Sequence, residues 1–185
     1  MSVMNARHAF SDRELRDALG LFATGVAVVT TGTADGEHVG TTVSSFNSVS
    51  LDPPLVLFSI ARSAKAFPVW RSARFFAVNI LDERQNAVSN RFAKSLTDKW
   101  TGIEAIIRRT GIPILKHALA WFECERYADY DGGDHLIILG HVLALGMTDH
   151  TDQLPLVFFR SKYRRLDDET KINTPFDTDH WLHGW

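Results

Sequence analysis

Hydroxyl side chains are concentrated between residues 41 and 50, where six serine or threonine residues and one asparagine occur in the run TTVSSFNSVS. Hydroxyls and backbone N–H groups at the end of a strand can hold a phosphate group or the carbonyl edge of a flat ring. Arg62, Lys65, Arg91 and Lys94 are near enough in sequence to supply positive charge. The same composition also suits a half-exposed strand followed by a serine-rich turn, so the residues alone leave both interpretations open.

A histidine at the end of a glycine turn is the second feature that could do chemistry. His135 follows Gly133 and Asp134 and precedes a long apolar run, which places its imidazole at the rim of the predicted sheet. There the imidazole could donate a hydrogen bond to a carboxamide or a phosphate, and Asp134 could bias its protonation. Most histidines in such turns have no catalytic role, so this residue alone decides nothing.

Other chemistries are disfavoured by what the sequence lacks. No GxGxxG motif follows a strand and no GxxxxGK[ST] motif occurs, so neither a Rossmann crossover nor a P-loop is predicted. His141 would lie about 20 Å from His135 along an extended strand, so the two cannot share a metal ion, and we expect no metal site. Cys124 is interpreted as a small buried hydrophobe, and the GxSxG elbow of a serine nucleophile is absent.

The elements that must position these residues are mainly short strands. Ser11 and Glu14 form a capping-box pattern, and apolar residues at helical spacing then predict a helix over residues 12–24. Runs of β-branched and aromatic residues, divided by turn residues, predict strands at 26–31, 39–46, 55–60 and 75–81. A second helix is predicted over 82–94, followed by a looser segment at 95–113.

The clearest supersecondary prediction is a long hairpin in the second half of the chain. Strands are predicted over 118–130 and 135–147, joined by a tight turn at residues 131–134, which read DGGD. A last strand is predicted over 155–163. These elements together predict a mainly β protein, in the form of a barrel with a few helices.

Length and composition predict one domain over residues 1–166 and a tail over 167–185. With 20 Lys and Arg against 22 Asp and Glu, nothing favours nucleic acid or a membrane as a partner. The single cysteine and the lack of an apolar leader predict a cytoplasmic protein. The tail aromatics Phe176, Trp181 and Trp185 could cover a neighbouring subunit or belong to a disordered end, and the sequence leaves this open.

Segments spread along the chain resemble the flavin reductase-like family, whose members supply reduced flavin to partner monooxygenases. They include FATGVAVVTT, FFAVNIL, WFECE and PLVFFRSKYRRL, and the most specific are SVSLDPPL at 48–55 and GDHLIILG at 133–140. The resemblance covers residues 12–166. It implies an FMN-binding split β-barrel, a Greek-key-like closed barrel, that binds FMN or FAD at a homodimer interface. It also implies hydride transfer from NADH or NADPH and a flavin-dependent monooxygenase as partner. The reduced flavin could reach this partner by diffusion alone.

The resemblance also implies roles for individual residues. His135 would be the catalytic residue that faces the nicotinamide in front of the flavin. The flavin and its phosphate would be bound by Thr42, Val43, Ser44, Ser45, Ser59, Ile60, Arg62, Ser63, Phe92, Ala93, Lys94, Tyr163 and Arg164. The family often has Asn or Ala where this chain has Ser44. Two other functions stay open from the residues alone, a noncatalytic flavin carrier and a split-barrel flavin oxidase.

Overall fold

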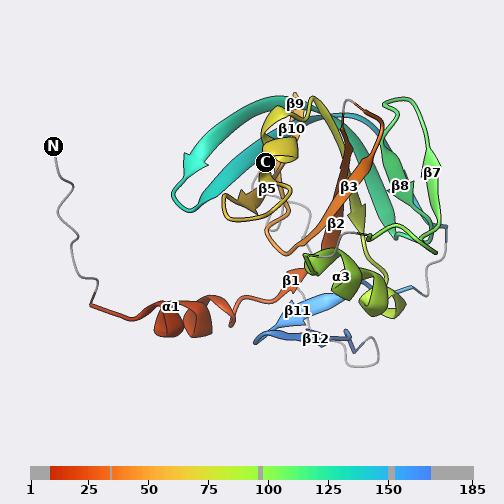
Figure 1. Cartoon of the computed structure of the whole chain (residues 1–185). Helices are drawn as coiled ribbons and strands as arrows, with labels where there is room; N and C mark the ends of the chain where they lie inside the picture. Colours follow the sequence, from red (N-terminus) through yellow and green to blue (C-terminus); the bar gives the residue numbers. More distant parts are fainter. Residues whose placement is uncertain (1–8, 34, 96–97, 150–152, 168–185) are drawn as a thin grey trace, which may run out of the picture.

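The computed structural model describes residues 9–33, 35–95, 98–149 and 153–167, and the protein is mainly β, as the sequence predicts (Figure 1). Within these residues the helices are α1 Asp12–Leu19, α2 Phe67–Ser72, the 3-10 helix η1 Glu83–Gln85, and α3 Asn86–Ala93. No helix in this part of the chain is both long enough and apolar enough to cross a membrane. The predicted tail aromatics lie outside the described residues.

Seven antiparallel strands form the main sheet, in the order β3, β2, β6, β9, β10, β5, β4. Their bounds are β2 Ala27–Gly32, β3 His38–Val43, β4 Asn47–Leu51, β5 Pro54–Ala61, β6 Phe75–Ile80, β9 Ala120–Gly132 and β10 His135–Met147. Across the described residues no ladder joins the edge strands β3 and β4, so backbone pairing does not close the expected barrel. β3 and the end of β5 instead both contribute lining residues to one cavity.

Two smaller sheets lie beside the main one. β1 Thr24–Gly25, β11 Val157–Phe159 and β12 Lys162–Arg164 form the first, and β7 Ala105–Ile107 pairs with β8 Pro113–Leu115 in the second.

The main core is built around aromatic rings. Phe58 of β5, Trp70 of α2 and Phe76 of β6 are fully buried. The Phe58 ring meets those of Trp70 and Phe76 edge to face, with centroid separations of 5.5 and 5.1 Å. Gly140 of β10 makes room for this packing, because a Cβ at that position would lie 2.2 Å from the Phe76 ring. The core therefore fixes how β5, β6 and β10 lie against one another.

The hairpin of β9 and β10 is confirmed and forms the longest part of the sheet (Figure 1). Its turn contains Gly133 with φ 73°, a conformation that glycine adopts without strain. On its other side β10 pairs with β5, and this register places His135 opposite Ala61. The pairing thus carries the imidazole to the end of β5.

Three predicted elements differ from those observed, and one of them is the strand predicted over 39–46, which ends at Val43 as β3. The first helix ends at Leu19 with Gly20 as its C-cap, whereas the sequence predicts a helix to residue 24. The Gly20 carbonyl accepts a hydrogen bond from the Arg160 backbone, and β1 then pairs with β11, so the chain is already extended. The predicted strand 155–163 is interrupted by a turn at Arg160 and Ser161, whose φ values of 49° and 59° are incompatible with a strand.

The structure also contains elements that the sequence pattern does not indicate. β4 occupies the serine-rich segment expected to be a loop, and α2 follows β5. β7 lies in the segment 95–113 and pairs with β8, which begins at the end of that segment. The predicted helix over 82–94 is confirmed as η1 followed by α3. Asp82 starts η1, because its side chain accepts a hydrogen bond from the Arg84 backbone.

Candidate functional site

A cavity of about 510 Å³ opens where the ends of β3 and β5 meet the tip of the β9–β10 hairpin. Its volume lies within the usual range of small-molecule sites. It is lined by Thr41, Thr42, Val43, Ser44, Ser45, Ser59, Ile60, Ala61, Gly132, His135 and Ile137. The hydroxyl-rich strand end and the turn histidine, which are far apart in sequence, therefore belong to one cavity.

Several residues singled out from the sequence line this cavity, and three further lining residues were missed. Those that line it are Thr41 of the hydroxyl-rich run and Thr42, Val43, Ser44, Ser45, Ser59, Ile60 and His135, and Arg62 and Ser63 directly follow the lining residue Ala61. The missed residues are Ala61, Gly132 and Ile137. Ile137 lies two residues after His135 on the same strand, so alternation of side chains along the strand could have indicated it.

The hydroxyl groups at the cavity differ in how they are bound. The Ser45 hydroxyl accepts a hydrogen bond from the backbone N–H of Ser59 at 2.9 Å, which ties the loop after β3 to β5. The Thr42 hydroxyl donates to the carbonyl of Ser89 in α3 at 2.7 Å, so it can offer a ligand only an acceptor. Ser44 is exposed, so its hydroxyl can donate a hydrogen bond to a ligand.

Arg62 holds the hairpin tip against the end of β5. Its Nε donates to the Gly133 carbonyl at 3.0 Å, and its terminal nitrogen donates to Asp131 at 2.8 Å. Its backbone N–H also donates to the carbonyl of Asp134 at 2.9 Å. The guanidinium that the resemblance assigns to the flavin is thus engaged with the turn that carries His135.

His135 is oriented by its neighbour Asp134. The Nδ1 atom of the imidazole lies 2.7 Å from Oδ1 of Asp134, and this hydrogen bond holds the pKa of Asp134 below its usual value. The His135 side chain is 43% exposed. With Nδ1 directed to the carboxylate, Nε2 is the ring nitrogen that can meet a ligand.

Tyr163 contacts α3, which is hydrogen-bonded to the cavity residue Thr42. Its hydroxyl lies 2.8 Å from the Ser89 hydroxyl and donates to Asn90 at 3.2 Å. Because Ser89 also accepts the hydrogen bond of Thr42, these contacts join β12, α3 and β3. The structure places Tyr163 as a support for Thr42, outside the lining of the cavity.

The other residues that the resemblance assigns to the flavin also lie outside the lining. Phe92 is fully buried and packs against Trp100, with ring centroids 5.0 Å apart, so its side chain belongs to the core. Ala93 and Lys94 lie at the exposed C-terminal end of α3, and Arg164 is exposed in β12.

The cavity offers few groups for covalent or acid–base chemistry. His135 is the only titratable side chain among its lining residues. Burial raises the pKa of the Cys124 thiol to about 12, so this cysteine is not a nucleophile at neutral pH. Among the described residues no group of three His, Cys, Asp or Glu side chains could hold a metal ion. The arrangement therefore suits holding and aligning polar, planar ligands.

Comparison with known proteins gives a consistent result. The family described as flavin reductase like domain matches residues 19–167. A probable flavin reductase of Rhizobium meliloti (strain 1021) is 47% identical over 135 residues, which are 73% of this chain and 43% of that protein. The reductase subunit HsaB of a flavin-dependent monooxygenase, from Rhodococcus jostii (strain RHA1), is 34% identical over 94% of this chain and 88% of that protein.

A solved structure is also similar. The NADH:FAD oxidoreductase SgcE6 of Streptomyces globisporus, in complex with NAD and FAD fragments, superposes with a TM-score of 0.80 at 33% identity. The match covers 86% of this chain and 96% of that one. This chain spans only about half the length of the first curated relatives, 43% and 59% of the first two.

Proposed function

The chain belongs to the flavin reductase-like domain family, and we propose that it is an NAD(P)H-dependent flavin reductase. It reduces FMN or FAD by hydride transfer from NADH or NADPH. The observation that carries this proposal is the single cavity in which the hydroxyl-rich end of β3 and the hairpin histidine meet. The similarity to the NADH:FAD oxidoreductase SgcE6, which is 33% identical, supports NADH as the hydride donor and FAD as the acceptor.

The cavity residues fit a flavin in chemistry and in space. A bound flavin supplies a ring that accepts a hydride, so the protein needs no nucleophile of its own. The exposed Ser44 hydroxyl and the backbone N–H groups around residues 43–46 offer donors to the imide edge of the ring or to the phosphate. Ile60 and Ile137 supply apolar contacts for the ring system.

His135 acts on the nicotinamide side of the cavity. With Nδ1 held by Asp134, Nε2 can donate a hydrogen bond to the carboxamide of the nicotinamide. Such a bond orients the donor ring over its acceptor, and orientation is the main contribution that a protein makes to hydride transfer. His135 is therefore the residue we assign to catalysis, through alignment.

The remaining assigned residues have less direct roles. Ser59, Arg62 and Ser63 shape the strand end beside the flavin. We assign the end of α3 and Arg164 to the phosphate of the flavin. Phe92 and Ala93 would contribute backbone atoms there, and Lys94 and Arg164 would contribute exposed charges. Tyr163 stabilises Thr42 through Ser89.

We infer a homodimer that delivers reduced flavin to a flavin-dependent monooxygenase by diffusion. The HsaB relative, a reductase subunit of such a monooxygenase, supports the partner. The resemblance to the family supports the homodimer, with the flavin at the interface between the two copies. The family resemblance also leads us to propose that one domain over residues 1–166 forms a split barrel. We further propose that the protein is cytoplasmic.

The function is tested by mixing the purified protein anaerobically with each nicotinamide and each flavin while following the absorbance of NADH and of oxidised flavin. A flavin reductase oxidises NADH or NADPH in step with loss of the flavin band. A noncatalytic carrier binds the flavin without this change, and a flavin oxidase of another substrate binds the flavin but leaves NADH and NADPH unoxidised. Either of these two results would overturn the proposal.

A further inference from the structure

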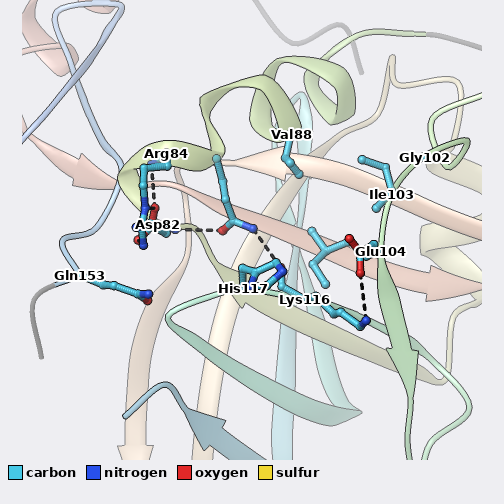
Figure 2. A pocket seen from close by; sticks show the side chains of 11 residues that line it. Asp82, Arg84, Val88, Gly102, Ile103, Glu104, Lys116, His117 and Gln153 are labelled. Carbon is cyan, nitrogen blue, oxygen red and sulfur yellow. Dashed lines mark hydrogen bonds and ion pairs between the residues drawn. The ribbon is translucent and has the colours of Figure 1, made fainter. Parts of the chain in front are cut away.

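A second cavity, of about 460 Å³, lies beside η1 and α3 and shares no lining residue with the first (Figure 2). It is lined by Asp82, Arg84, Gln85, Val88, Gly102, Ile103, Glu104, Leu115, Lys116, His117 and Gln153. The proposed reductase activity uses none of these residues. The cavity is large enough for a small metabolite.

The charged residues of this second cavity form two ion pairs. Asp82 binds Arg84 through both oxygens, at 2.8 and 2.9 Å, and Glu104 accepts a hydrogen bond from Lys116 at 2.9 Å. Gln85 connects the two sides, because it accepts from the Asp82 backbone and donates to the Lys116 carbonyl, both at 3.0 Å. The charges of the two pairs cancel, and Gln85 links them into one hydrogen-bonded polar frame.

His117 is the side chain that lies between these pairs. Figure 2 shows its imidazole between the Arg84–Asp82 and Lys116–Glu104 pairs. Lys116 adds donors, since an ammonium has three N–H groups and the bond to Glu104 uses one. A carboxylate at this place could therefore accept hydrogen bonds from both the Lys116 ammonium and an imidazole N–H of His117.

The backbone of His117 is in a conformation that its side chain makes costly. Its φ is 63°, in the left-handed region that glycine adopts freely and that histidine and asparagine enter more often than most other residues, but at some cost. A glycine at the end of β8 would make the same turn without this strain. Non-glycine residues held in such conformations cluster at ligand-binding sites, where the side chain serves a purpose.

The rest of the lining is apolar. Leu115 is buried, and Val88 and Ile103 are partly buried and pack against the same core. Figure 2 shows Val88 and Ile103 across the cavity from His117. A ligand that reaches both sides needs a compact apolar body and one polar, charged end.

We propose that this second cavity binds a small monocarboxylate, with its carboxylate at His117 and Lys116 and its apolar body against Val88, Ile103 and Leu115. A singly charged anion fits better than a phosphate, because the charges of Arg84 and Lys116 are already balanced by Asp82 and Glu104. This site is independent of the flavin cavity.

The test is an NMR titration of the ¹⁵N-labelled full chain with cyclohexanecarboxylate and with its neutral isostere, cyclohexanecarboxamide. The carboxylate should shift the amide signals of Gln85, Lys116 and His117, with a Kd of about 1 mM. The carboxamide should bind at least about tenfold more weakly, because it lacks the charge. Equal affinities would overturn the proposal, as would shifts confined to residues 41–45 and 59–61.

His117→Gly separates a binding role from a structural one. This variant should weaken carboxylate binding about tenfold or more, while its Tm stays the same or rises because the strain is relieved. His117→Asn, which tolerates the left-handed conformation but lacks the imidazole, should show the same loss. Ser161→Gly is the matched control, since it relieves a φ of 59° away from this cavity and should keep the affinity. Unchanged binding in both His117 variants would overturn the assignment.

Discussion

At the scale of single residues, His135 is the side chain whose replacement tests the proposed hydride transfer most directly. His135→Ala removes the donor expected to hold the nicotinamide carboxamide but leaves the end of β3 intact. We expect kcat/KM for the nicotinamide to fall about tenfold, the size of one hydrogen bond, with flavin affinity near that of the wild type. Steady-state kinetics and a flavin titration measure the two effects.

His141→Ala is a suitable control for this prediction. His141 lies on the same strand, six residues further along, and outside the cavity lining. Its replacement should leave the KM for the nicotinamide unchanged. If His135→Ala also has wild-type kinetics, His135 has no role in aligning the nicotinamide.

Residue types indicated the cavity better than they indicated the partners of each residue. The hydroxyl density of residues 41–50 and the turn position of His135 were enough to single out two parts of the lining. Arg62 and Phe92 show the limit, because one binds a turn and the other fills the core. Which of two available partners a guanidinium takes depends on tertiary distances that the local sequence does not contain.

At the scale of elements, the contact between Arg62 and the hairpin turn can be separated from a contact between Arg62 and the flavin. If Arg62 positions the turn, Arg62→Ala and Asp131→Ala should raise the KM for the nicotinamide by similar factors, and the double variant should be no worse than either. If Arg62 binds the flavin phosphate, Arg62→Ala alone should weaken flavin binding. Flavin titrations and initial rates of the three variants distinguish the two roles.

Asp82 connects β6 to α3 and predicts a pH dependence of stability. Its side chain is only 3% exposed, and its hydrogen bonds with Arg84 hold its pKa below the usual 3.8. A lowered pKa means that the contribution is complete above pH 3.8 and is lost as the pH falls through the folded-state value. Asp82→Asn should lower the free energy of unfolding by about 1 kcal/mol at pH 7.

The difference between wild type and Asp82→Asn should shrink as the pH falls below 3.8, because both side chains are then uncharged. Urea unfolding at several pH values measures it. A difference that grows towards acid would show that Asp82 does not stabilise the protein through its charge.

Elements with strong local signals were predictable, and elements fixed by tertiary contacts were not. The β9–β10 hairpin has long apolar runs and a turn of glycine and aspartate, so its sequence specifies it locally. α2 has only six residues, and it is held by buried Trp70 and by Arg126, whose Nε donates to the Ala73 carbonyl at 2.8 Å. β7 and β8 have three residues each, too few for alternation to be recognised.

At the scale of the whole molecule, the strand order could not be read from the sequence. β9 and β10 pair between β6 and β5, although α2 is the only element between β5 and β6 along the chain. This arrangement depends on packing across the core, where Gly140 of β10 lies against Phe76 of β6. Local patterns predict strands, but such contacts decide which strands become neighbours.

The outline of the molecule predicts that α1 is covered by a second copy. Figure 1 shows α1 extending away from the sheets, and none of its residues is buried. Leu15 and Leu19 share one helix face at i, i+4 spacing, and with Phe22 they are 43%, 64% and 78% exposed. A helix of eight residues is marginal in water without packing, so an apolar face of this size requires a partner surface.

We therefore expect the wild type to sediment as a dimer and Leu19→Asp to sediment mainly as a monomer at micromolar concentration, because a buried charge would oppose the contact. Asp17→Asn, in the same helix turn, removes a charge without adding one and should remain dimeric. Sedimentation velocity of the three proteins measures this directly. If the open cavity is completed by the second copy, reductase activity should fall together with the dimer fraction in Leu19→Asp. A dimer that survives this change would place the interface elsewhere on the molecule.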